Sequence, residues 1–150
     1  MIKEKYQTRV RETSICVAQT KVESLRKKDI TRTGYRVYNE GFIGVSSTLG
    51  DHHSEEMYQR AAEALKLKIP YAFQASGNYQ ESIVLDKEII KEDVFVNEME
   101  EVLTILGKDY PGFTFFDKIN LGSQEVSLQN DNNLDLYYNC LLYTSDAADE

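Results

Sequence analysis

The stretch "TGYRVYNEGFIGVSSTLGD", Thr33–Asp51, carries the clearest local structural signal in this chain. Side chains alternate between the two faces of a β-strand. Tyr35 and Val37 therefore fall on one face of a predicted strand, and Arg36 and Tyr38 fall on the other. A second predicted strand follows, with Phe42, Ile43 and Val45 as its apolar residues. The pattern predicts two strands of an antiparallel hairpin.

Turn residues on either side extend this hairpin into an antiparallel meander over residues 1–50. Asn39-Glu40-Gly41 supplies residues that tolerate a positive φ. Gln19-Thr20 predicts an earlier turn, in a stretch rich in Thr, Val, Ile and alternating charge. Gly44, inside the return strand, indicates a bulge or a close approach of another backbone.

Two helices are predicted downstream of the meander. The first begins with Ser54 as N-cap and stops at Pro70. The second lies within residues 82–112, with Gly107 at the C′ position and Pro111 just beyond. The apolar stripes, set by helical spacing, are Met57, Ala61, Ala64 and Leu65 for the first helix and Phe95, Met99, Val102, Leu103 and Leu106 for the second. Residues 70–82 have no clean period and are predicted to be a long connection, whose role stays open.

Strands return after the second helix, over residues 113–122, 123–130 and 134–139. The cluster Asn130-Asp131-Asn132-Asn133 predicts a hairpin turn between the last two. The element order is then meander, helix, helix, strands. This order predicts an α+β fold of two layers, in which an antiparallel β-meander sheet is covered on one face by two helices.

Composition places the chain among soluble globular proteins. Of its 150 residues, 41% are hydrophobic and 28% are charged. No apolar run approaches the length that crosses a bilayer. The first twelve residues, "MIKEKYQTRVRE", contain no apolar signal segment. We therefore predict a cytoplasmic location and no membrane partner.

Charge is distributed unevenly along the chain. Residues 1–50 hold ten Lys/Arg against five Asp/Glu, whereas residues 51–139 hold seven against seventeen. A basic segment can indicate nucleic-acid binding. Alternating charges on the solvated face of a sheet explain the same pattern, and no aromatic-plus-basic platform accompanies it. We predict no nucleic-acid partner, with nucleic-acid binding as the alternative.

Few side chains could carry catalysis. His52 and His53 are adjacent, and no second histidine follows one helical turn on, so both are predicted to be solvent-facing loop residues. Cys16 lies in a strand-like stretch and is predicted to be buried or half-buried, with a catalytic thiol as the alternative. No metal-ligand spacing relates Cys16 to Cys140. The residues themselves predict no catalytic, cofactor-binding or metal-binding site.

The order of these motifs resembles the N-terminal region of TldD/PmbA (TldD/TldE) proteins, over residues 5–139. The hairpin matches the family pattern at Gly34, Arg36-Val37, Gly41, Phe42, Gly44 and Ser46-Ser47-Thr48. The helix from Ser54, with alanines 61, 62 and 64, falls where the family has one. Glu125–Asn139 is similar to the family's strand, Asn-Ser-x-Gly turn and strand, except that Asp131 and Asn133 replace the Ser and the Gly.

The resemblance implies a function for a longer parent protein. TldD-type members are zinc metallopeptidases that act on peptides or unfolded segments. Their metal site is a downstream His-Glu-x-x-x-His helix with a more distant Cys. PmbA/TldE-type members lack these ligands and pair with the TldD type. No residue of this chain matches the metal motif, so the resemblance implies zinc only for the parent, which would act as a homo- or hetero-dimer.

Three interpretations remain open. The chain is the non-catalytic N-terminal domain of a TldD-like peptidase, contributing to the substrate chamber or a subunit interface. Alternatively, it is the corresponding part of a PmbA/TldE-like partner subunit without metal. The third interpretation is an unrelated α+β binding module.

The last eleven residues, "CLLYTSDAADE", Cys140–Glu150, form a separate feature. They have no helix period, no cap and no predicted strand partner. They resemble, in register, the translation of a transposase adapter used in sequencing libraries. We therefore predict that residues 1–139 are an N-terminal α+β domain, truncated from a longer protein, and that residues 140–150 are an artefactual tail.

Overall fold

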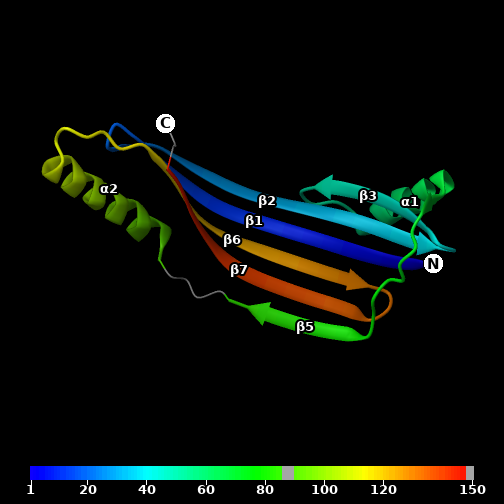
Figure 1. The fold of residues 1–150 in the computed structure, drawn as a ribbon. Helices are drawn as coiled ribbons and strands as arrows, with labels where there is room; N and C mark the ends of the chain where they lie inside the picture. Colours follow the sequence, from blue (N-terminus) through cyan, green and yellow to red (C-terminus); the bar gives the residue numbers. More distant parts are fainter. Residues whose placement is uncertain (86–89, 148–150) are drawn as a thin grey trace. The chain divides into compact units, whose positions relative to one another are not determined.

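The computed structural model describes the backbone of residues 1–85 and 90–147. Within these residues, seven strands form one sheet in the order β4-β3-β2-β1-β6-β7-β5 (Figure 1). The strands are β1 (Ile2–Ala18), β2 (Lys21–Asn39), β3 (Phe42–Leu49), β4 (Ile69–Pro70), β5 (Tyr79–Val84), β6 (Asp117–Asn130) and β7 (Leu134–Ala147). The helices are α1 (Ser54–Ala64) and α2 (Glu92–Asp109), with a short 3₁₀ turn at Leu65–Leu67. No helix in this described part is long and apolar enough to cross a membrane.

The predicted α+β class is confirmed, but the sheet is mixed. Strands β2 and β3 pair antiparallel, as expected for the hairpin. Strand β5 pairs with β7 in the parallel direction, with Tyr79 opposite Leu134 and Val84 opposite Asn139. The prediction of a purely antiparallel sheet was therefore wrong, because it missed β5.

The chain divides into two compact units, to which the long strands both contribute. Unit 1 comprises Met1–Val10, Ile30–Leu85 and Gln124–Cys140, and it contains α1. Unit 2 comprises the described residues within Arg11–Asp29, Asp86–Ser123 and Leu141–Glu150, and it contains α2. Each unit packs one helix against part of the sheet.

Unit 1 contains the predicted hairpin and its helix. Asn39 lies opposite Phe42 in the ladder, and Glu40 and Gly41 between them both have positive φ, as a two-residue hairpin turn requires. Tyr35 and Val37, predicted to share one face of a strand, are both buried. The α1 residues that are buried are Met57 and Ala61.

Gly44 explains how α1 reaches the sheet. A Cβ atom at this position would lie 1.9 Å from the carbonyl oxygen of Ala61, so only glycine fits under the helix. The Ser46 hydroxyl donates a hydrogen bond to the carbonyl oxygen of Met57 at 2.7 Å. The predicted close backbone approach at Gly44 is confirmed.

Unit 2 is built around a separate apolar cluster. Ile15 and Val17 of β1 and Phe95 and Leu103 of α2 are its buried members. The partly buried residues packed against them are Val22, Ile90, Val96, Met99, Ile119 and Leu121. The predicted turn at Gln19-Thr20 is confirmed, since both residues have positive φ.

The predicted helix ends differ from those observed. Ser54 is the first residue of α1, not its N-cap, and its hydroxyl lies 3.3 Å from that of Tyr35. The helix ends at Ala64, before Pro70, because a 3₁₀ turn and a left-handed Lys68 redirect the chain. Pro70 instead pairs with Phe42 of β3. Gly107 lies inside α2, which continues to Asp109.

Other predicted boundaries were also wrong. Residues 79–82, assigned to the long connection, begin β5, and residues 113–116 precede the observed strand β6. Strand β6 runs without a break through Gly122, where a Cβ atom would lie 2.9 Å from the carbonyl oxygen of Arg11. Val102 is 45% exposed and so lies outside the buried stripe of α2.

The C-terminal segment is only partly described. Strand β7 continues to Ala147, so the prediction that the tail has no strand partner was wrong for its first residues. Residues 148–150 lie outside the described residues, as do residues 86–89, which fall in the stretch predicted to contain the second helix. The origin of the tail, and residue 139 as the end of the native segment, stay predictions.

Candidate binding cleft

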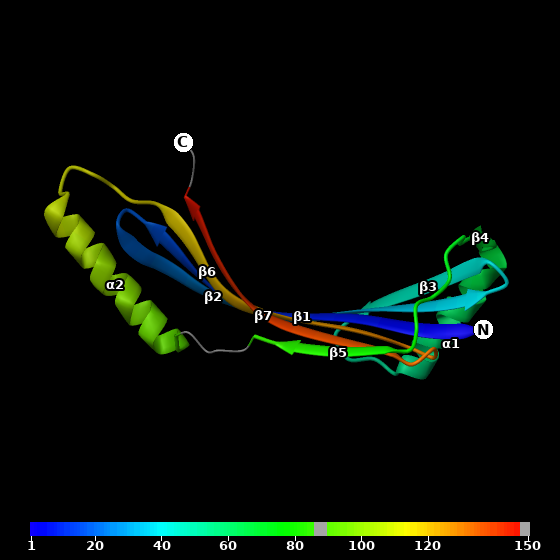
Figure 2. The same ribbon diagram turned by 60° about the horizontal axis from the view of Figure 1, so that its bottom comes forward.

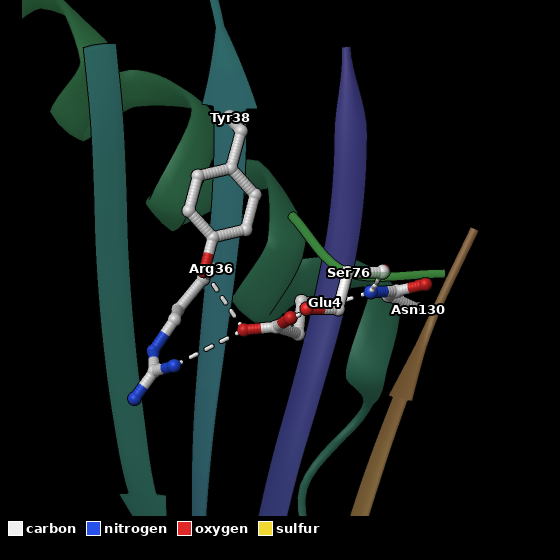
Figure 3. Close-up of polar contacts among 5 residues, drawn as sticks. All are labelled: Glu4, Arg36, Tyr38, Ser76 and Asn130. Atoms are coloured by element: carbon white, nitrogen blue, oxygen red, sulfur yellow. Dashed lines mark hydrogen bonds and ion pairs between the residues drawn. The ribbon is translucent and has the colours of Figure 1, made fainter. Parts of the chain in front are cut away.

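Glu4 anchors the most developed polar cluster of unit 1. Its side chain is 7% exposed. One carboxylate oxygen accepts hydrogen bonds from the Arg36 guanidinium at 3.0 Å and from the Tyr38 hydroxyl at 2.8 Å (Figure 3). The other accepts from the Asn130 amide at 3.4 Å. Because Arg36 and Tyr38 alternate with the buried Tyr35, this cluster lies on the face of the sheet opposite α1.

The cluster is suited to holding strands together. A buried carboxylate must be paired and hydrogen-bonded, and both oxygens of Glu4 have partners. Burial and the hydrogen bond to Glu4 raise the pKa of Tyr38 to about 12, so its phenol is a neutral donor at pH 7. With its oxygens engaged, Glu4 is poorly placed to act as a general base.

Residues 71–78 cross this face as a loop that is held at both ends. At the start, the Tyr71 amide donates to the carbonyl oxygen of Gly41 at 2.8 Å. At the end, the loop is held by the turn at residues 130–133, here called the asparagine turn. The Asn130 side chain donates to the carbonyl oxygen of Ser76 at 2.8 Å, as Figure 3 shows, and Asn132 donates to that of Ala75 at 3.2 Å.

The asparagine turn itself is the predicted hairpin turn. Asn133 has a φ of 60°. The Asn130 side-chain oxygen accepts hydrogen bonds from the backbone amides of Asn132 and Leu134, at 2.9 and 3.3 Å. Gly77 packs directly on this turn, because a Cβ atom there would lie 2.4 Å from the carbonyl oxygen of Asn132. The turn therefore both caps itself and fixes the loop.

A cleft of about 450 Å³ lies between the loop and the sheet. Glu4 and Arg36 supply its charged groups, and its apolar and aromatic lining consists of Tyr38, Tyr71, Tyr79, Leu128, Leu134 and Leu136. A second cleft of about 360 Å³ shares Tyr38 and Tyr71 with the first and adds Phe73.

Aromatic rings line the wall between the two clefts. The Tyr38 and Tyr71 ring centroids are 5.1 Å apart, and those of Tyr71 and Phe73 are 5.6 Å apart. Phe73 is 75% exposed. Apolar walls with a few fixed polar groups are typical of ligand sites, and aromatic faces suit bulky apolar side chains. The cleft can therefore hold a bulky apolar group beside one guanidinium.

The residues considered for catalysis lie elsewhere. His52 and His53 are exposed and precede α1, as predicted. Cys16 is half-buried as predicted, and its Sγ lies 3.7 Å from a carboxylate oxygen of Glu23. Within the described residues, no group of three or more His, Cys, Asp or Glu side chains could hold a metal ion.

Several basic side chains of the first fifty residues form ion pairs. Arg36 pairs with Glu4, Lys3 with Glu55 and Lys27 with Glu92. Each pair joins two residues of the same unit. Acidic partners within the chain therefore neutralise part of the positive charge of residues 1–50. Nucleic-acid binding stays an untested alternative.

Sequence comparison finds no relative: no protein-family model and no curated protein matches the chain. Solved structures do match. TldE from Thermococcus kodakarensis superimposes with a TM-score of 0.75 at 15% identity, covering 99% of this chain and 40% of that protein. The chain has the TldE fold. This confirms, for the fold, the resemblance to TldD/PmbA proteins.

Two further structures share the TldE fold. A "putative modulator of a DNA gyrase" from Thermotoga maritima gives a TM-score of 0.73 at 16% identity, over 99% of this chain and 36% of that one. A second, from Bacteroides thetaiotaomicron, gives 0.71 at 13% identity, over 97% and 36%. The chain therefore spans about two fifths of the length of these proteins.

Proposed function

We propose that the chain is the non-catalytic N-terminal α+β domain of a TldD/PmbA-like protein. The observation that carries the proposal is the TldE fold, which takes in 97–99% of this chain but only 36–40% of each similar structure. In this proposal, zinc and peptide hydrolysis belong to parts of the parent protein outside the described residues. The parent acts in the cytoplasm as a homo- or hetero-dimer.

The domain's own contribution is to line the chamber that receives peptide substrates. The two clefts that share Tyr71 support this role, because the leucine side chains of the first and Phe73 of the second would bind apolar residues of an unfolded segment. The loop that carries these aromatics is fixed at both ends, so the cleft is formed before a peptide arrives. A place at the subunit interface is the alternative role for the same surface.

A metal-free partner subunit is the second candidate function. The structural similarity to TldE from Thermococcus kodakarensis favours this candidate. In the resemblance described above, TldE-type proteins are the partner subunits that lack the metal ligands. The two candidates share this domain and differ downstream. A His-Glu-x-x-x-His motif in the rest of the reading frame would select the peptidase, and its absence there would select the partner subunit.

The test uses the full-length protein encoded at the native locus. We expect Phe73→Ala to raise KM for an apolar peptide several-fold with kcat unchanged, which is the signature of lost ground-state and transition-state binding alike. Phe113→Ala is the matched control, because Phe113 is 70% exposed and lies in unit 2. Equal KM values for Phe73→Ala and wild type would exclude the second cleft, which Phe73 lines, from the substrate chamber.

A parent that lacks the metal motif is tested as a complex with its metal-bearing subunit. The same two variants are then introduced into this chain only. A KM change confined to Phe73→Ala would support the chamber role in the partner subunit. Failure of the chain to form any such complex would contradict the second candidate.

A further inference from the structure

Asn130 lies where the loop of residues 71–78 meets the asparagine turn. In both ribbon views the loop passes beside this turn before the chain enters β5 (Figure 2). The Oδ1 atom of Asn130 accepts hydrogen bonds from the backbone amides of Asn132 and Leu134, at 2.9 and 3.3 Å. Both donors lie in the turn or directly after it, so this end of the side chain holds the turn together.

The other end of the Asn130 amide points out of the turn. Its Nδ2 atom donates to the carbonyl oxygen of Ser76 at 2.8 Å and to a carboxylate oxygen of Glu4 at 3.4 Å (Figure 3). A backbone carbonyl and a carboxylate only accept hydrogen bonds, so serving both of them takes an NH₂ group. A flipped amide would set its oxygen against these two acceptors and its NH₂ group against two backbone N–H groups. The surrounding groups therefore match an asparagine amide in this one orientation.

Asn130 also links the end of the loop to β1. Neighbouring contacts tie the loop to the turn: the Asn132 side chain donates to the carbonyl oxygen of Ala75 at 3.2 Å, and the Asn78 backbone amide donates to the carbonyl oxygen of Asn132 at 2.7 Å. Glu4, which shares the Nδ2 group of Asn130 with the loop, belongs to β1. The Nδ2 atom of Asn130 therefore bonds the loop and β1 at once.

We propose that Asn130 is the positioning residue of the cleft between the loop and the sheet. Ser76 lines this cleft of about 450 Å³ from the loop and Glu4 lines it from β1, whereas Asn130 itself does not line it. The Asn130 amide thus acts on the width of the cleft and not on the ligand. The inference rests on the proposed function, in which the ligand is an apolar side chain of an unfolded peptide. A cleft held at the right width binds such a side chain without the entropy cost of ordering the loop.

Asn130→Asp tests the assignment in the full-length protein encoded at the native locus. The variant keeps the oxygen that holds the turn, but it sets a second oxygen against the Ser76 carbonyl and the Glu4 carboxylate. We expect the Asn78 backbone amide to exchange its hydrogen roughly tenfold faster than in wild type, because the loop opens more often. The KM of the enzyme, or of its complex with a metal-bearing subunit, should rise several-fold for an apolar peptide, with kcat unchanged.

Gln129→Glu is the matched control. Gln129 donates to a carboxylate oxygen of Asp135 at 3.0 Å in an exposed contact. The control therefore opposes two carboxylates one residue away from Asn130 without touching the loop. Its exchange rate at Asn78 and its KM should both equal those of wild type.

A double variant separates the loop contact from a general loss of stability. Glu4→Gln/Asn130→Asp exchanges the amide and the carboxylate, which restores a hydrogen bond between the two positions but still leaves an oxygen against the Ser76 carbonyl. We expect the double variant to unfold at a higher urea concentration than Asn130→Asp, and to keep the fast exchange at Asn78.

Hydrogen exchange and KM decide between two kinds of failure. Unchanged exchange at Asn78 in Asn130→Asp, or exchange slowed to the wild-type rate in the double variant, would overturn the inference. Fast exchange in Asn130→Asp with an unchanged KM would instead contradict the proposed chamber role, because a displaced loop would then not affect peptide binding.

Discussion

The hydroxyl of Tyr38 donates a 2.8 Å hydrogen bond to the carboxylate of Glu4, which also receives the guanidinium of Arg36. Glu4 belongs to β1 and the other two residues belong to β2. The contact thus joins the N-terminal strand to the hairpin strand on the face of the sheet that carries the cleft. It is the polar counterpart of the apolar packing of α1 on the opposite face.

Removing the charge of Glu4 should destabilise the protein. Glu4→Gln leaves Arg36 without its anion, and since Arg36 is 41% exposed, water offsets part of the loss. We expect the free energy of unfolding to fall by about 1–3 kcal/mol in urea titrations. Glu55→Gln is the control, because its ion pair with Lys3 is exposed and should contribute less than about 1 kcal/mol. A loss as large for Glu55→Gln would contradict the assigned role.

A side chain at Gly44 should push α1 away from the sheet. Gly44→Ala would place its Cβ atom 1.9 Å from the Ala61 carbonyl oxygen, and we expect a loss of about 1–3 kcal/mol, the typical cost of overpacking. Gly112→Ala is the control, because no atom lies within 4 Å of its Cβ position. Equal unfolding midpoints for the two variants would show that α1 does not pack as described.

The buried face of α2 can be tested by two truncations. Phe95→Ala removes a side chain that is 8% exposed and should cost about 3–5 kcal/mol of unfolding free energy. Val102→Ala removes one that is 45% exposed and should change it by less than about 0.5 kcal/mol. Chemical denaturation measures both. A reversed order of the two losses would mean that the opposite face of α2 is buried.

Stability should fall at high pH because of two tyrosines. Burial raises the pKa of Tyr38 to about 12, aided by Glu4, and burial likewise raises that of Tyr58 to about 12. A pKa raised by folding means that stability is present below the unfolded value of 10.0 and is lost as pH rises toward 12. Urea titrations from pH 9 to 12 should therefore show a steeper decline for wild type than for Tyr38→Phe/Tyr58→Phe. Parallel curves would contradict this assignment.

Local patterns predicted the hairpins well. The turns at Gln19-Thr20 and Glu40-Gly41 are set by residues that accept positive φ. Alternation along β2 placed Tyr35 and Val37 on one face, which the structure shows to be buried. Gly44 was notable because a glycine inside a strand often marks a bulge or the close approach of another backbone. These features depend on a few neighbouring residues, so they can be read from the sequence.

Features that depend on distant residues were missed. Strand β5 is exposed on all six residues and gains its hydrogen bonds from β7, so it shows no alternation that would reveal it. The cleft depends on Glu4 meeting Arg36, 32 positions away, and on Asn130 meeting Ser76. The Asn-rich cluster signalled a turn, but nothing local indicated that it would also hold the loop 71–78.

The native reading frame beyond codon 139 tests whether this chain is part of a longer TldD/PmbA-like protein. Sequencing the locus from source DNA, without transposase-based libraries, measures it. We predict that the frame departs from the present sequence near Asn139 and continues for more than the length of this chain, as expected for a protein of which the chain forms about two fifths. A native stop codon directly after Glu150 would contradict the proposal that this chain is the N-terminal domain of a longer TldD/PmbA-like protein.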